Sequence, residues 1–364
     1  MLWIMRPNYD MTRASNPYKS GAMFKAREDY ATDLVDIGAK PLDMYDYYYR
    51  KEPADMWSGR MDGMLAGFHA GDTLILQLPF FVRPLNLKYI TEQIQQVYHG
   101  KVIGMVHDYE PLRQRGLAIH DKNSDGWLDQ YSYKTYKLLF PMMDALIVHS
   151  HAFKDAIQKD LNYKKPIIVQ GPFGYHFTNA ANIGAPKFEK KLIFAGSLPK
   201  AQYLKHVPAD WQLEVYGTAP AKEMLALKQV DYRGSFSPEQ LPNEFTGGFG
   251  LVWDSTTFPT VTGELGEYTK LAYEHKLSLY LARRIPVIVW DESAPAQWVV
   301  KNHLGFAVHD LTEVAPLINR LTKKDYDKLQ SNLSRVARLI QRGDYVKTAA
   351  MTAYMAVNEQ NHQY

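Results

Sequence analysis

The chain alternates short apolar, β-branched runs with stretches of helical periodicity, and this alternation constrains its fold more than any other feature. Amphipathic, helix-like stretches such as 22–37 separate runs that are typical of strands. In the first half these runs are 2–7, 72–80, 101–108, 144–150 and 165–173. Strand, helix and strand in succession is the pattern of parallel sheets whose faces are covered by helices. The sequence therefore predicts an α/β fold of Rossmann-like type.

A second, similar series begins after a polar segment. Its predicted strands are 191–197, 212–218, 229–235, 248–254, 286–290 and 305–310. The residues 178–190 between the two series are small, polar and aperiodic, which is typical of a linker. Two Rossmann-like halves with parallel sheets that face a central cleft are predicted. Ligands of such sheets bind beyond the carboxyl ends of the strands, so the residues just after each strand are the candidates for function.

Bulk composition excludes several classes of protein. The 364 residues carry a net charge of +3, too small for a nucleic-acid-binding face but compatible with peripheral association with an anionic membrane surface. The chain has no cysteine, which rules out disulfides and thiolate-bound metals. No secretory h-region opens the sequence and no apolar run approaches the ~18 residues of a membrane span, so we expect a cytoplasmic protein.

Lys276 stands at an unfavourable place for a cation. The spacing of Leu277, Tyr280 and Leu281 predicts a helix from about residue 274 to 284, and Lys276 lies in its first turn, where the helix dipole is positive. Free backbone N–H groups there bind anions, and Lys276 with the hydroxyl of Ser278 would complete a cradle for a phosphate or diphosphate. The alternative is a solvated lysine that is partly balanced by the neighbouring acid at position 274.

Three turns after strands of the second half are further candidates for donor binding. In "FAGSLPK", a glycine turn would bring Gly196, Ser197 and Lys200 to the cleft, although an ordinary strand-to-helix turn has the same pattern. Neither GxGxxG nor GxxxxGK[ST] is present, so the dinucleotide and P-loop fingerprints are missing.

The next two turns carry aromatic residues. Tyr216 and Gly217 lie in "VYGTAP", and Phe236 lies in the stretch 233–245. Both rings are suited to framing a nucleobase, and both are equally suited to the core. The sequence leaves these two alternatives open.

The first half offers a candidate base after the strand 101–108. Asp108, with His107 as the alternative, would accept a proton from a hydroxyl, and Arg113 and Arg115 would hold an anionic group. In the competing interpretation, Asp108 caps the next helix and the arginines are solvated. Gly21 precedes the helix near the N-terminus and would allow a substrate to approach closely.

Three sequence patterns resemble metal-binding sites but lack a feature that such a site requires. Residues 121–129 imitate the start of an EF-hand loop, but its twelfth position is Ser132 and the bidentate acid is absent. The two histidines of 149–151 have no carboxylate partner, and Ser150 between them is a natural helix N-cap. The DxD pattern at 325–327 lies in a charged helical stretch rather than after a buried strand. We therefore expect no bound metal.

The stretch "EHKLSLYLARRIPVIVW" (274–290), with the glycine turn at Gly196 and the two Rossmann-like halves, resembles GT-B glycosyltransferases. The resemblance is closer to the Gtf3-like glucosyltransferases and the β-1,6-galactofuranosyltransferases, which share "GLVWD" and an "HD" with "LR" in the first domain. One departure is Arg284, where those proteins tend to have glycine before "IPVIV".

The resemblance implies a donor site. A UDP-sugar would be the donor, with its diphosphate against Lys276 and Ser278, Ser197 and Lys200 on the same molecule, and Tyr216 near the nucleoside. It also implies domains at 1–180 and 185–342, with a last helix at about 343–364 that crosses back to the first. Members of that family often form tetramers and modify adhesin glycans or exopolysaccharide precursors.

The expected activity is an inverting, metal-independent hexosyl transfer, with Asp108 as base and Lys276 at the leaving group. Closure of the two halves about a hinge would assemble the site. The sequence leaves two alternative functions open. A UDP-sugar epimerase also uses two Rossmann-like halves and needs no acceptor. A catalytically inactive GT-B homologue would instead stabilise a partner transferase.

Overall fold

The computed structural model of the chain describes residues 1–8, 21–45, 54–79, 84–113 and 133–359. Arg115 and the EF-hand-like stretch, for which the sequence makes predictions, lie outside these residues. Among the helices that the structure describes, none has the length and apolar character needed to cross a membrane.

The chain forms two compact units. Unit 1 consists of Met1–Lys19, Arg27–Gln170 and Val346–Tyr364, and unit 2 of Ser20–Ala26 and Gly171–Tyr345. The division at residues 170 and 171 comes before the polar stretch 178–190 that was expected to be the linker.

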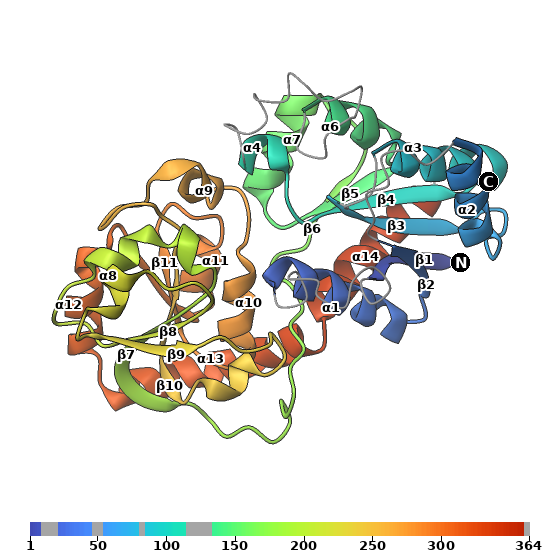
Figure 1. The fold of residues 1–364 in the computed structure, drawn as a ribbon. Coiled ribbons are helices and arrows are strands. Elements are labelled where there is room, and N and C mark those ends of the chain that lie inside the picture. Colours follow the sequence, from blue (N-terminus) through green and yellow to red (C-terminus); the bar gives the residue numbers. More distant parts are fainter. Residues whose placement is uncertain (9–20, 46–53, 80–83, 114–132, 360–364) are drawn as a thin grey trace. The chain divides into compact units, whose positions relative to one another are not determined.

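Unit 1 contains a six-stranded sheet in the order β2-β1-β3-β4-β5-β6 (Figure 1). Every neighbouring pair is parallel, as the alternation of strands and helices predicts. The strands are β1 (Leu2–Asn8), β2 (Lys40–Tyr45), β3 (Thr73–Leu78), β4 (Lys101–Val106), β5 (Ala145–Val148) and β6 (Ile167–Val169). The helices among them are α2 (Ala54–Leu65), α3 (Pro84–Glu92), α4 (Glu110–Arg113), α6 (Tyr133–Leu139), α7 (His151–Leu161) and, from Arg27 onward, α1 (Ala22–Asp36).

The last helix, α14 (Asp344–Asn358), completes the core of unit 1, and Figure 1 shows it in red beside the first strands. Its apolar face packs with residues of β1, β3, β4 and β5 in one buried cluster. The helix contributes Val346, Ala349, Ala350, Ala353 and Val357 to that cluster. Polar contacts fix the helix at its edge, where Lys347 donates to Asp36 at 2.5 Å and Asn358 donates to Thr73 at 3.2 Å.

Unit 2 contains the second parallel sheet, in the order β12-β11-β10-β7-β8-β9. Its strands are β7 (Lys187–Ala195), β8 (Leu213–Tyr216), β9 (Val230–Gly234), β10 (Gly247–Val252), β11 (Val287–Trp290) and β12 (Gly305–Val308). Its helices are α8 (Lys222–Leu225), α9 (Gly263–Tyr268), α10 (His275–Ala282), α11 (Ala296–Lys301), α12 (Val314–Arg320) and α13 (Lys323–Gln341).

Both faces of the unit 2 sheet are buried at its centre, although the edge strand β9 is partly exposed. Along β7, Leu192 and Phe194 belong to one apolar cluster, whereas Ile193 and Ala195 belong to another. Successive side chains of a strand point to opposite faces, so the two clusters are the cores on either side of the sheet. Burial on both faces explains why these strands are continuous apolar runs in the sequence.

Asp325 caps α13. Its carboxylate accepts from the N–H of Thr322, and the Thr322 hydroxyl accepts from the N–H of Asp325, which together make a capping box. The acid that begins the DxD pattern thus has a structural role at a helix start.

Gly217 follows β8 and lets two turns touch. A Cβ on Gly217 would lie 2.2 Å from the backbone oxygen of Gly196 and 2.9 Å from Cγ of Leu198. The Gly196 N–H donates to the carbonyl of Tyr216 at 3.1 Å. The turns after β7 and β8 are therefore packed backbone against backbone, and only glycine fits at this position.

Gly217→Ala should lower the free energy of unfolding by about 2–4 kcal/mol, because the added methyl group forces a rigid backbone apart. Urea denaturation followed by tryptophan fluorescence measures the change. The matched control is Gly184→Ala, since a Cβ at Gly184 meets nothing within 4 Å. Equal stability of the two variants would contradict the close packing.

Candidate active site

Lys276 is the centre of a charged cluster at the carboxyl edge of the unit 2 sheet. It lies in the first turn of α10, and its Nζ is 2.5 Å from Oδ1 of Asp254, just after β10. Nζ also donates to the carbonyl of Trp253 at 3.2 Å and lies 5.0 Å from the ring centroid of Phe194. Gly196 is adjacent, because a Cβ there would lie 4.0 Å from Cε of Lys276.

The lysine is not solvated, since only 12% of its side chain is exposed. Burial opposes the charge on its ammonium group, but Asp254 and Glu274 outweigh this effect and raise the pKa of Lys276 above its ordinary value. Lys276 is therefore a charged, part-buried cation whose direct partner is Asp254.

Glu274 lies at the N-cap of α10 without making a side-chain cap bond. The residue as a whole is half-buried, but both carboxylate oxygens are covered; no donor among the described residues reaches them, and the Asp254 carboxylate lies within hydrogen-bonding reach. Burial raises the pKa of Glu274 to about 8, with Lys276 opposing the rise and Asp254 adding to it. Glu274, the acid offered by the sequence as a partial counter-charge, therefore holds a proton more readily than an ordinary carboxyl group, and Asp254 makes the ion pair with Lys276.

Ser278 is fully buried, and its hydroxyl has no partner among the residues that the structure describes. A contact between this hydroxyl and a ligand at Lys276 would therefore need a local rearrangement. After β7, Gly196, Ser197 and Lys200 are exposed, and Ser197 begins the short 3₁₀ turn Leu198–Lys200. These three residues are accessible to a ligand at the sheet edge.

Tyr216 belongs to the core of unit 2. Only 1% of it is exposed, its hydroxyl donates to Glu214 at 3.2 Å, and its ring centroid is 5.3 Å from that of Phe245. Of the two alternatives left open by the sequence, core packing is the one observed. Phe236 is half-buried, with its ring centroid 6.0 Å from that of Tyr216, so it borders the same core.

Helix α10 ends in a left-handed residue. Arg284 has φ of 64°, and the N–H groups of Arg284 and Ile285 donate to the carbonyls of Leu281 and Tyr280, as in a Schellman motif. Glycine normally occupies this position because a Cβ is disfavoured there. The Arg284 guanidinium donates to the carbonyls of Ile183 and Gly184, which offsets the strain.

His107, in unit 1, has a defined tautomer. The Gln77 amide nitrogen donates to the carbonyls of Met5 and Arg27 at 2.9 and 3.1 Å, so the Gln77 oxygen is an acceptor. His107 Nε2 lies 2.7 Å from that oxygen and must be the donor. In the neutral imidazole, Nδ1 then carries the lone pair.

Asp108 is engaged by an arginine. Its Oδ1 lies 3.5 Å from Nε of Arg113, whose Nη1 donates to the buried Glu110 at 2.8 Å. Arg113 therefore bridges two carboxylates of its own unit, and a substrate anion would have to compete with both. Gly21 is half-buried, and its carbonyl accepts from the N–H groups of Phe24 and Lys25 in the first turn of α1.

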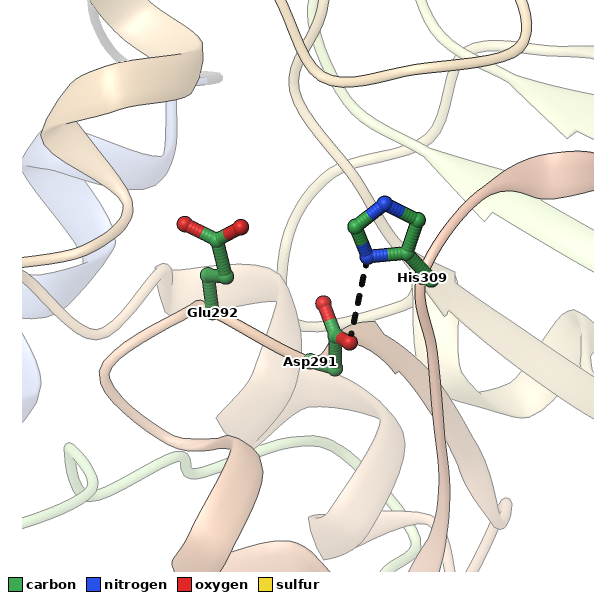
Figure 2. A group of neighbouring side chains, drawn as sticks. All are labelled: Asp291, Glu292 and His309. Carbon is green, nitrogen blue, oxygen red and sulfur yellow. Dashed lines mark hydrogen bonds and ion pairs between the residues drawn. The ribbon is translucent and has the colours of Figure 1, made fainter.

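Among the residues that the structure describes, one group of side chains could hold a cation, and the sequence patterns do not reveal it. Asp291, Glu292 and His309 follow β11 and β12, and one ligand atom of each lies within 4.8 Å of the others (Figure 2). All three are exposed, His309 is 3.3 Å from Asp291, and Lys270 already pairs with Glu292 at 3.0 Å. A cation would have to compete with this lysine.

Residues 8–172 match the Glucosyltransferase 3-like N-terminal domain, and residues 192–353 match the Glucosyltransferase 3-like C-terminal domain. The chain belongs to the glucosyltransferase 3-like family. Glucosyltransferase 3 of Streptococcus gordonii is 27% identical over 334 residues, which are 91% of this chain and 94% of that protein. The β-1,6-galactofuranosyltransferase WbbI of Escherichia coli is 24% identical, covering 90% of this chain and 92% of its own.

The fold of this family member is GT-B. Sucrose-phosphate synthase from Thermosynechococcus elongatus has a TM-score of 0.62 at 10% identity, covering 99% of this chain and 100% of its own. The lipopolysaccharide outer core galactosyltransferase WaaB in its apo form has a TM-score of 0.54 at 11% identity, covering 97% and 99%. With the family membership, this fold makes the chain a glycosyltransferase.

Asp254 belongs to the charged cluster of this candidate site, and sequence reasoning did not find it. It is 22 residues from Lys276, and no short motif connects them. The signal that would have found it is positional, because Asp254 comes just after the buried strand β10, at the edge where α10 begins.

Proposed function

We propose that the chain transfers a hexose from a UDP-sugar to a sugar hydroxyl of a glycan, glycoprotein or polysaccharide precursor, with inversion and without a metal. The observation that carries this proposal is the part-buried Lys276, charged and placed at the N-terminus of α10. A helix N-terminus with a lysine beside it favours a diphosphate, and the names of the relatives favour a hexose donor.

The leaving group needs cationic stabilisation. As the bond between the sugar C1 and the diphosphate oxygen breaks, the oxygen takes the electron pair and becomes more negative. Lys276 would exchange part of its contact with Asp254 for this oxygen, and the dipole of α10 would add to the effect. Because the ammonium is already held in place, little reorganisation would be required.

The attacking hydroxyl needs a base. Asp108 is our choice, with His107 as the alternative, and the proton would move to the base as the acceptor oxygen bonds to C1. The hydrogen bond with Gln77 holds the His107 ring in one orientation. In this scheme Arg113 is a positioning residue that holds the Asp108 carboxylate.

Lys276→Ala should weaken UDP binding by about 10- to 100-fold, since a charge-assisted hydrogen bond is lost. Asp254→Asn should leave binding equal or tighter, because it removes the carboxylate that competes for the same ammonium. Calorimetric titration of UDP measures both, and Lys323→Ala, an exposed lysine, is the control.

Removing Lys276 also leaves Asp254 without its counter-charge, so the variant should be less stable as well. The double variant Lys276→Ala with Asp254→Asn restores charge balance and should recover stability without recovering affinity. Normal UDP binding by a folded Lys276→Ala variant would overturn the proposed site.

Asp108→Asn should reduce turnover by about 10²- to 10⁴-fold, with little effect on UDP affinity, because it removes a proton acceptor rather than a donor contact. Steady-state transfer rates and calorimetry together make this distinction. Asp155→Asn, an exposed acid on α7, is the control. If Asp108→Asn keeps full turnover while His107→Gln loses it, the base is His107.

A panel of nucleotide sugars, assayed with and without sugar acceptors, tests the reaction class. Sugar consumption should require an acceptor and should be unchanged by EDTA. Conversion of the donor without an acceptor would indicate an epimerase instead. Inhibition by EDTA that disappears in His309→Ala would instead assign a functional cation to the Asp291, Glu292 and His309 group.

A further inference from the structure

Both carboxylate oxygens of Glu274 are buried and no donor among the described residues reaches them, whereas the carboxylate of Asp254 lies within hydrogen-bonding reach of Glu274. Glu274 borders a cavity of about 10 Å³, close to the minimum for a single water molecule, at the carboxyl ends of β10 and β11. Asp254, Thr269 and Ser293 also line this cavity. A buried carboxylate that no donor reaches is costly, so its retention beside a proposed ligand site requires an explanation.

Four hydroxyl groups of described residues near Glu274 donate their hydrogen bonds to backbone carbonyls instead of to Glu274. The Thr269 and Ser293 hydroxyls donate to Gly266 and Trp290, each at 2.6 Å. Tyr280 donates to Ile193 at 3.1 Å and accepts from the N–H of Ala195, and Tyr203 donates to Trp253 at 3.4 Å. Burial raises the pKa of both tyrosines, so they are neutral.

In the part of the chain that the structure describes, the charged groups that act on Glu274 are Lys276 on α10 and Asp254 after β10. Two ionised carboxylates have no proton between them and cannot hydrogen-bond. A proton on Glu274 turns it into a donor toward Asp254. The cluster of Lys276, Asp254 and Glu274 is then neutral, whereas ionised Glu274 would leave a net negative charge in a buried place.

A diphosphate at Lys276 would add negative charge beside Glu274 and raise its pKa further above about 8. By linkage, a ligand that raises a pKa binds more tightly to the protonated form and takes up protons. Below the pKa of the empty protein the proton is already present and affinity does not depend on this group. Above it, affinity falls as pH rises, by up to tenfold per unit.

We propose that Glu274 is a positioning residue that acts as a neutral acid. Its proton forms a hydrogen bond to Asp254, which leaves the Lys276 ammonium available to the donor diphosphate. Where Glu274 is ionised in the empty protein, it takes up this proton as the diphosphate binds. The inference rests on the proposed function, since it needs a diphosphate at Lys276. It predicts that donor binding is coupled to the protonation of one buried carboxyl group.

The test is calorimetry of UDP with the full chain between pH 7.5 and 9.5, where a phosphoryl group and an ordinary imidazole have finished titrating. At pH 8.5, heats in two buffers of different ionisation enthalpy give the number of protons taken up. The wild type should take up a substantial fraction of one proton, and its affinity should fall above pH 8.

Glu274→Gln mimics the neutral acid and should bind UDP with no proton uptake and with constant affinity from pH 7.5 to 9.5. Glu274→Ala cannot hold Asp254 and should bind more weakly than Glu274→Gln at every pH. A role that is only structural would not be rescued by glutamine in this pH-independent way. The control is Glu267→Gln, an exposed acid, which should behave as the wild type.

Three results would overturn the inference. These are wild-type binding without proton uptake, uptake that is unchanged in Glu274→Gln, and equal affinities of the Gln and Ala variants. Each of them leaves UDP binding intact, so the proposed function would survive. Absence of UDP binding to the wild type would overturn the proposed function as well.

Discussion

The ion pair between Lys276 and Asp254 makes it possible to keep a cation below the surface of unit 2. Desolvation of an ammonium group costs several kcal/mol, which only a close counter-charge can offset. The pair links the end of β10 to the start of α10. Both its stability and its chemistry depend on the distance between these two elements.

The distance between β10 and α10 is fixed by close packing of the helix against the sheet. A Cβ on Gly250 of β10 would lie 2.4 Å from Cγ of Tyr280, so α10 lies nearer to the sheet than any larger residue would allow. The Tyr280 hydroxyl bonds to the backbone of β7 at both Ile193 and Ala195. Helix α10, which carries Lys276, is thereby held against the neighbouring strands β10 and β7. The position of the candidate site is therefore set by the sheet.

The two parallel sheets could be predicted because burial on both faces produces continuous apolar runs. The strand β2 was missed because "KPLDMY" mixes polar and apolar residues, and as an edge strand it can tolerate Pro41. Lys276 was found from a local conflict with the helix dipole. Asp254 and Gln77 were not, because their partners are 22 and 30 residues away. Tyr216 stayed ambiguous because core and base-contacting aromatics share one pattern.

The place of α14 has a consequence for how the protein is made. The sheet of unit 1 is complete in sequence by Val169, but Val346 to Val357, which help to fill its core, are synthesised only after the whole of the intervening chain. At about 5–20 residues per second, a ribosome needs on the order of ten to forty seconds for the intervening chain. During that time unit 2 can fold on its own residues, while unit 1 waits with part of an apolar face uncovered. The N-terminal unit would then finish folding second, and part of its sheet would stay open to other chains until α14 is made.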